Sequence, residues 1–183
     1  MSAIASLFFV GSLSMSPSLA DSKTTPTSSG RPSEKFRAEH VEIKKHLSQV
    51  EQWAGELSNS PLNEQKKTML KITKFFKEDI KPHAEWEERK LYPAVDKRAA
   101  KGPEIFTATM RYEHTIVARW IGQLDTLATS KTANAALFTR KTDQLLGLLY
   151  AHFEEEEEVL LPILDKSMTP AEFKEEILSG SAH

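Results

Sequence analysis

The feature that most constrains this chain is an eleven-residue segment that occurs twice. The first copy, residues 83–93, reads HAEWEERKLYP, and the second, residues 152–162, reads HFEEEEEVLLP. The copies align without a gap and share a His, three Glu, a Leu and a Pro. Residues four apart on an α-helix lie one turn apart on the same face. Each copy therefore presents a His and a Glu that can approach one metal ion together: His83 with Glu87, and His152 with Glu156.

A further Glu-His pair precedes each copy, at Glu39-His40 and at Glu113-His114. The complete pattern is therefore a His followed by HxxxE, stated twice. Six residues are candidate metal ligands on this basis: His40, His83, Glu87, His114, His152 and Glu156.

Apolar residues recur at steps of three and four around these ligands, which is the pattern of helices that face a bundle core. The first such segment follows Ser33, a candidate N-cap, and has His40 on its apolar face and His46 off it. The core positions expected on the four segments are Phe36, Ile43, Leu47, Val50, Ala54 and Leu57; Met69, Ile72, Phe76 and Ile80; Met110, Val117, Ile121 and Leu124; Phe138, Leu145, Leu149 and Leu160. We therefore predict an all-α fold, an up-and-down antiparallel four-helix bundle with a short C-terminal helix.

The spacing of the turns predicts that the four core-facing histidines lie at one level. Turns are expected near residues 61–62, 99–103 and 130–134, and the sequence midpoints between successive histidines fall on or beside them. Because a helix rises about 1.5 Å per residue, neighbouring histidines are equally far from the turn that joins their helices. Four histidines and two glutamates should thus meet in one buried layer near one end of the bundle. A local bend is expected at Pro82, just before this layer, since proline removes a helical hydrogen bond.

The 183 residues, 39% of them hydrophobic, suffice for one core and do not suggest several domains. Residues 1–20 have a short apolar centre and a small-x-small end, which predicts a signal peptide and an exported, periplasmic protein. The apolar run is shorter than the roughly 20 residues of a membrane span, so no stable membrane insertion is expected after signal removal. Residues 21–32 read as a flexible polar linker, residues 33–168 as the bundle, and residues 169–183 as a short helix and tail. That helix should begin with a capping box from Thr169 to Glu172.

Composition excludes several functions. The chain has no cysteine, which excludes disulfides, thiolate catalysis and thiolate metal sites. Its formal net charge of -2 provides no basic surface for nucleic acid, so no nucleic-acid partner is expected.

The buried layer has a structural alternative, because a single His on an apolar face is more often a hydrogen-bonded core residue than a ligand. Residues 154–158 alone would likewise be a solvated acidic face, and only the repeat singles out Glu156. Four histidines and two glutamates buried with nothing bound would cost several kcal/mol. The ligand types fit two non-haem iron ions, carboxylate-bridged and oxo- or hydroxo-bridged, with positions open to oxygen, peroxide or nitric oxide. Zinc or manganese fits the same ligands.

The sequence resembles the hemerythrin family, specifically its HHE cation-binding branch, over roughly residues 33–166. The residues that carry the resemblance are Glu39-His40, His83-x-x-x-Glu87-Glu88 with Leu91-Tyr92-Pro93, Glu113-His114, and His152-x-x-x-Glu156-Glu157 with Leu161-Pro162. The resemblance implies an up-and-down four-helix bundle with a non-haem di-iron centre. It implies the same six ligands, with Glu87 and Glu156 as the bridges.

Two departures separate the chain from the oxygen-carrying hemerythrins. The carriers have a second His one turn from the third-helix His, where this chain has Met110 and Ala118 on either side of His114. They use a carboxylate five residues after the last His, whereas the repeat here favours Glu156, with Glu157 at the fifth position. These departures argue against simple reversible oxygen carriage.

The expected function is therefore a metal-binding protein whose di-iron centre binds or reacts with oxygen, peroxide or nitric oxide. One alternative is a module for iron storage, delivery or sensing without turnover. A second is a di-iron protein of the iron-sulfur repair type, although such proteins act in the cytoplasm and often carry a cysteine-containing N-terminal domain. A third is a metal-free or zinc-containing structural bundle. The redox partner is not specified by the sequence.

Overall fold

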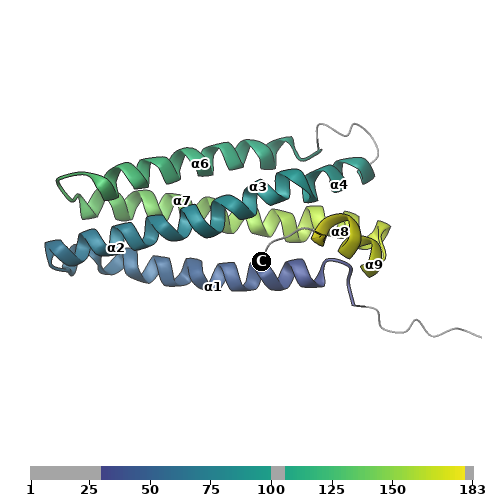
Figure 1. The fold of residues 1–183 in the computed structure, drawn as a ribbon, viewed down its shortest axis with the longest axis horizontal. Helices are drawn as coiled ribbons and strands as arrows, with labels where there is room; N and C mark the ends of the chain where they lie inside the picture. Colours follow the sequence, from purple (N-terminus) through teal and green to yellow (C-terminus); the bar gives the residue numbers. More distant parts are fainter. Residues whose placement is uncertain (1–29, 100–105, 180–183) are drawn as a thin grey trace, which may run out of the picture.

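The computed structural model describes residues 30–99 and 106–179, which form an up-and-down bundle of four helical arms (Figure 1). The first arm consists of α1 (Glu34–Glu56) and the short 3-10 helix η1 (Leu57–Asn59). The second contains α2 (Leu62–Phe75), the π-helix η2 (Phe76–Ile80), α3 (Lys81–Arg89) and α4 (Leu91–Arg98). The third is α6 (Ala108–Thr129), and the fourth contains α7 (Ala135–Glu155), the π-helix η3 (Glu156–Leu160) and α8 (Leu161–Ser167). No strand occurs in the described ranges, and the predicted all-α bundle is confirmed.

The first arm begins where the sequence predicted, but Ser33 does not cap it. Its side chain makes no capping hydrogen bond to α1. The Ser33 backbone N–H and hydroxyl instead donate to the two carboxylate oxygens of Asp165, each at 2.9 Å. The start of α1 is thereby attached to α8 on the fourth arm.

Helical regularity is lost in the two arms that carry the repeat, close to the prolines. Pro93 has no N–H to bond to residue 89, and the second arm is interrupted at Lys90, where φ is -121°. Pro162 likewise leaves residue 158 without its helical donor, and the fourth arm is π-helical from Glu156 to Leu160. Near Pro82, where a bend was expected, the π-helix η2 ends and α3 begins.

Two hydrophobic clusters fill the bundle, one on each side of the predicted His-Glu layer. The larger lies among α1, α2, α6 and α7 and includes Leu47, Ile72 and Leu149. The smaller includes Phe36, Tyr92 and residues of the C-terminal segment. The expected core positions are buried except Ile43, which is partly buried, and His46 lies exposed off the core face as predicted.

The C-terminal segment closes the end of the bundle that is nearer the layer (Figure 1). It consists of α9 (Pro170–Phe173) and the π-helix η4 (Lys174–Leu178), and the predicted Thr169–Glu172 capping box is present. Phe173 and Ile177 are fully buried in the smaller cluster.

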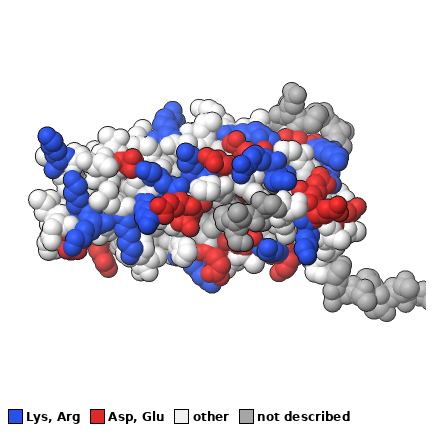
Figure 2. All heavy atoms as spheres, viewed as in Figure 1, with Lys and Arg blue, Asp and Glu red and all other residues white. Residues whose placement is uncertain are grey.

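Basic and acidic side chains are interspersed on the face drawn in Figure 2, without a large field of one sign. Among the described helices, none combines the length and apolarity needed to cross a membrane. The predicted signal peptide, the linker up to residue 29, residues 100–103 of the expected turn and the tail from residue 180 lie outside the described residues.

Candidate metal centre

All four arms contribute to the predicted layer. His40 comes from α1, His114 from α6 and His152 from α7, while α3 supplies two residues and η3 supplies Glu156. The side chains are almost fully inaccessible, with exposed fractions of 0% for His40, 5% for His83, 0% for Glu87, 7% for His114, 2% for His152 and 0% for Glu156. The structure brings all six predicted ligands together, and the expected single level of the four histidines is confirmed.

One half of the layer joins His40, His83 and Glu87. The Nε2 atoms of His40 and His83 are 3.3 Å apart, and Glu87 Oε1 lies 2.8 Å from His83 Nε2. The third side of this triangle, from His40 Nε2 to Glu87 Oε1, measures 3.6 Å. Ligand atoms bound 2.0–2.2 Å from one ion are separated by about 3 Å, so these three atoms have the spacing of ligands to a single cation.

The other half joins Glu87 to His114 and His152. The Nε2 atoms of these two histidines are 3.0 Å apart, and the second oxygen of Glu87 lies 3.3 Å from His114 Nε2. Glu87 thus belongs to both groups of three residues that could hold a metal ion.

Glu156 spans the same two halves from the opposite arm. Its Oε2 lies 3.5 Å from His40 Nε2, and its Oε1 lies 3.8 Å from His152 Nε2. Both carboxylates therefore connect the two histidine pairs, which is the arrangement needed for two bridging ligands.

Carboxylates outside the layer orient three of the four imidazoles. His40 Nδ1 contacts Glu157 at 3.1 Å, His114 Nδ1 contacts Glu88 at 3.1 Å, and His152 Nδ1 contacts Glu113 at 2.8 Å. An ionised carboxylate only accepts, so each Nδ1 is the donor and each neutral imidazole keeps an Nε2 lone pair that faces inward. Glu88 and Glu157 therefore support the layer and do not lie in it.

Three carboxylate oxygens of the layer have no protein donor to satisfy them. Both oxygens of Glu87 and Oε2 of Glu156 are buried and lack a hydrogen-bond partner. Although Glu87 Oε1 is close to an imidazole nitrogen, the two atoms do not meet in hydrogen-bond geometry. Buried acceptors that converge without donors are unfavourable unless a cation lies between them, so the residues present fit a pair of metal ions.

The two carboxylates of the layer titrate in opposite directions. Burial raises the pKa of Glu87, but the charge of His83 and the nearby imidazoles of His114 and His40 outweigh it and hold that pKa well below its usual range. Burial and the neighbouring charge of Glu87 raise the pKa of Glu156 well above its usual range. Two adjacent buried carboxylates cannot both ionise easily without a positive charge between them.

The contact between His40 and Glu157 shifts the pKa values of both groups. Burial lowers the pKa of His40, but the hydrogen bond to Glu157 and the contacts with Glu87 outweigh it, so the pKa is raised. His40, with Lys44 at 2.7 Å, lowers the pKa of Glu157 to about 2. Glu157 is therefore a carboxylate at neutral pH, as its role as acceptor requires.

Two arginines, which the sequence reasoning missed, hold the backbone of the residues that carry two of these carboxylates. Arg37 donates to the backbone carbonyl of Glu157 at 2.8 Å, and Arg111 donates to that of Glu88 at 3.3 Å. They occupy equivalent positions, each three residues before a ligand histidine. Extending the internal comparison upstream from the Glu-His pairs would have found them.

Tyr92 was also missed as part of the layer. Its hydroxyl donates to Glu156 Oε1 at 2.9 Å and lies 3.2 Å from His114 Nε2 and 3.3 Å from His152 Nε2. Burial, with the charges of Glu87 and Glu156, raises the pKa of the Tyr92 hydroxyl. The signal in the sequence was a difference between the repeats, because Leu161 occupies the equivalent position in the second copy.

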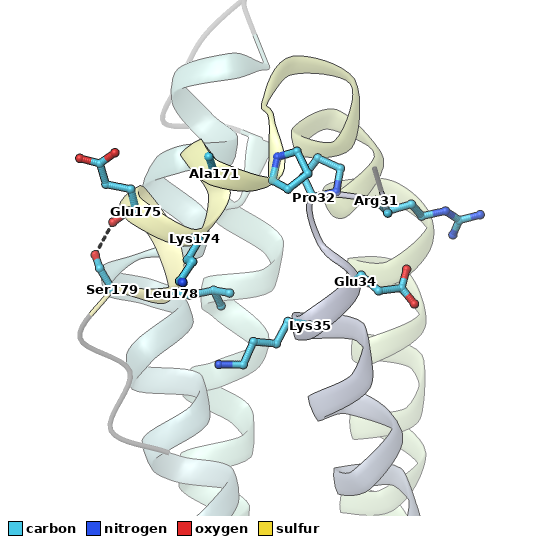
Figure 3. Close-up of a pocket in the computed structure, with 11 residues that line it drawn as sticks. Arg31, Pro32, Glu34, Lys35, Ala171, Lys174, Glu175, Leu178 and Ser179 are labelled. Carbon is cyan, nitrogen blue, oxygen red and sulfur yellow. Dashed lines mark hydrogen bonds between the residues drawn. The ribbon is translucent and has the colours of Figure 1, made fainter. Parts of the chain in front are cut away.

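One open cavity lies away from the layer. It has a volume of about 620 Å³ and lies between the start of α1 and the C-terminal segment (Figure 3). Lys35 points across it, whereas Arg31 and Glu34 point away. A smaller cavity of about 190 Å³ reaches the layer itself, since His114, Glu88 and Ala118 line it.

Comparison with known proteins gives one match, which agrees with the geometry. The family described as the hemerythrin HHE cation binding domain matches residues 31–164, which is most of the chain and includes all six layer residues. No curated protein and no solved structure shows significant similarity. The protein thus belongs to the hemerythrin HHE cation-binding family, and its buried His-Glu cluster fits the metal binding typical of that family.

Proposed function

We propose that the six-residue layer binds two non-haem iron ions and that the centre binds or reacts with a small ligand: oxygen, peroxide or nitric oxide. The observation that carries the proposal is Glu87, whose two oxygens face two different histidine pairs. One residue shared by two triangles of ligand spacing supports two ions and is hard to reconcile with one. The proposed ligands are His40 and His83 for the first ion, His114 and His152 for the second, and Glu87 and Glu156 as bridges.

A pair of iron ions supplies redox chemistry and coordination positions for a small ligand. The chain's own residues keep the surroundings of those positions dry, because the layer lies between two apolar clusters. Glu157, Glu88 and Glu113 hold the imidazoles in the tautomer that presents Nε2.

The cavity beside His114 supports entry of a small ligand. In this cavity Ala118 occupies one of the positions where an oxygen carrier could have its additional His, and the methyl side chain leaves open space next to His114. A volume of about 190 Å³ accommodates a diatomic molecule or peroxide and is too small for a large organic substrate.

Metal analysis of the purified full-length protein, combined with its optical spectrum, tests the first part of the proposal. About two irons per chain with iron charge-transfer bands are expected from the six proposed ligands. One zinc per chain, or no metal after anaerobic addition of iron(II), would overturn it.

Reactivity is tested separately on the reduced, iron-loaded protein. Oxygen, hydrogen peroxide and nitric oxide are each added anaerobically from stock solutions while the iron bands are recorded. At least one of them should change the spectrum, and no change with any of them would contradict the proposed reactivity. Continued consumption of peroxide or nitric oxide would separate turnover from the alternative of storage, delivery or sensing.

A further inference from the structure

Tyr92 breaks the internal symmetry of the layer. The arms that carry the repeat match at every ligand position, but Tyr92 in one arm corresponds to Leu161 in the other. Both side chains are fully buried in the smaller hydrophobic cluster. The phenol therefore supplies an oxygen to one half of the layer, whereas the side chain of Leu161 has no polar atom.

The distances from the Tyr92 hydroxyl to the neighbouring ligand atoms lie in the same range as the distances between the ligand atoms themselves. Its oxygen lies 3.2 Å from His114 Nε2, 3.3 Å from His152 Nε2 and 2.9 Å from Glu156 Oε1. The two histidine nitrogens are 3.0 Å apart. Atoms that share one ion at 2.0–2.2 Å are separated by about 3 Å, so the hydroxyl oxygen lies where a further ligand of that ion would lie.

The ring of Tyr92 is fixed in this position by its neighbours. It stacks on the imidazole of His114 with ring centres 5.3 Å apart and an angle of 23° between the planes. The guanidinium carbon of Arg111 lies 5.2 Å from the centre of the ring. A buried ring packed in this way has little freedom to turn its oxygen away from the layer.

We propose that Tyr92 is a seventh protein ligand, binding through its phenolic oxygen to the ion held by His114 and His152. This inference rests on the proposed function, since it requires a metal ion in that half of the layer. On binding, the O–H bond breaks, the oxygen donates an electron pair to the cation, and the proton is released to solvent. The charge of a bound cation is what makes a buried phenolate favourable, just as it lowers the pKa of bound water.

The two ions are consequently inequivalent. The ion at His114 and His152 gains a phenolate that the ion at His40 and His83 lacks. The two ions would then differ in the number of coordination positions left for a small ligand.

The test uses the full chain, loaded anaerobically with iron(II) and then oxidised with ferricyanide. Iron(III) phenolate has a visible charge-transfer band, and laser excitation within it enhances tyrosinate ring vibrations in the Raman spectrum. We expect this band in the wild type and its loss in Tyr92→Phe, with both irons retained because six ligands remain. The matched control is the double variant Tyr112→Phe and Tyr150→Phe, which removes the other two of the three tyrosines and should keep the band.

A wild-type measurement covers the case in which Tyr92→Phe does not fold. Protein produced with ring-deuterated tyrosine should show shifted vibrations if a tyrosine is the ligand. Two irons without tyrosinate vibrations, or a band that survives in Tyr92→Phe, would overturn this inference and leave the di-iron proposal intact. Failure to bind iron would overturn both.

Discussion

At the scale of single residues, the centre depends on two glutamates that no protein donor fully satisfies. Both are completely buried, and together they leave three carboxylate oxygens without a hydrogen-bond partner. The histidines around them direct nitrogen lone pairs to the same points, since three of the imidazoles donate outward through Nδ1. A cation is the natural complement of such a set, because it accepts all these lone pairs at once.

Removing one histidine from each half should eliminate metal binding. The variant His83→Ala with His152→Ala leaves each proposed ion one imidazole, so we expect iron content to fall from about two per chain to near zero by mass spectrometry. His46→Ala is the control, because His46 is exposed and off the core face. Equal metal loss in both proteins would show that the ligand assignment is wrong.

A finer test compares Glu113, which supports a ligand histidine, with Glu39, which does not. Each directly precedes a ligand histidine in the sequence. Glu113 accepts the hydrogen bond of His152 Nδ1, whereas the carboxylate of Glu39 has no hydrogen bond within the described part of the chain. Loss of such a supporting partner typically weakens metal binding by about 10–100-fold. We expect Glu113→Gln to do so in a competition titration with a chelator and Glu39→Gln to have a much smaller effect. A similar loss of iron affinity in both variants would show that the hydrogen bond from His152 to Glu113 does not support metal binding.

The six layer residues could be predicted from the sequence because the repeat isolates them. Glu156 stands in a run of five glutamates, and only its alignment with Glu87 distinguishes it. Tyr92 could not be predicted in this way, since symmetry identifies what the halves share and Tyr92 is where they differ. Glu88 and Glu157 each contact a histidine on a different arm, and helical spacing within one arm does not determine such contacts.

At the scale of helices, the four arms are joined by side chains near their ends as well as by the core. Asp165 on α8 binds the start of α1 through Ser33, and Asp96 on α4 binds the start of α6 in the same way, through the backbone N–H and hydroxyl of Thr107. The sequence predicted Ser33 only as a helix start and did not single out Thr107. Both partners lie on another helix, Asp165 132 residues from Ser33 and Asp96 11 residues from Thr107, so periodicity within one helix predicted neither contact.

Asp165→Ala should lower the free energy of unfolding by about 2 kcal/mol, because it removes two hydrogen bonds to a largely buried carboxylate. Asp143 is the matched control, since it is exposed and has no contact of this kind in the described ranges. Asp143→Ala should change stability by less than about 0.5 kcal/mol. Urea denaturation of the two variants in parallel measures both values. A loss below that of the control would show that the contact at Ser33 contributes nothing.

At the scale of the whole molecule, the C-terminal segment completes the smaller hydrophobic cluster. Phe173 and Ile177 are buried there, and Glu176 accepts two hydrogen bonds from the Arg98 guanidinium, at 3.0 and 2.6 Å. The prediction of a short helix from the capping box was correct. Its docking site was not evident, since four amphipathic helices leave no obvious place for a fifth.

The contact between Arg98 and Glu176 should make stability depend on pH in the acidic range. The Arg98 hydrogen bonds hold the pKa of Glu176 below its usual value of 4.5. The stabilisation is therefore complete above that pH and is lost as pH falls through the lower pKa of the folded protein. The difference in Tm between wild type and Glu176→Gln should be constant at neutral pH and vanish in acid. Glu175→Gln, which removes the same charge from an exposed neighbour, should show no such difference.

The position of the layer between two apolar clusters has a consequence for cooperativity. The two hydrophobic clusters are separate, so bound ions would couple the unfolding of one cluster to that of the other. With iron bound, backbone amides on both sides should exchange hydrogen for deuterium in a single global opening event. After chelation, amides around the smaller hydrophobic cluster should exchange faster than those around the larger one, because the two then unfold as separate foldons. Iron would then determine not only what the protein reacts with but whether it unfolds as one body.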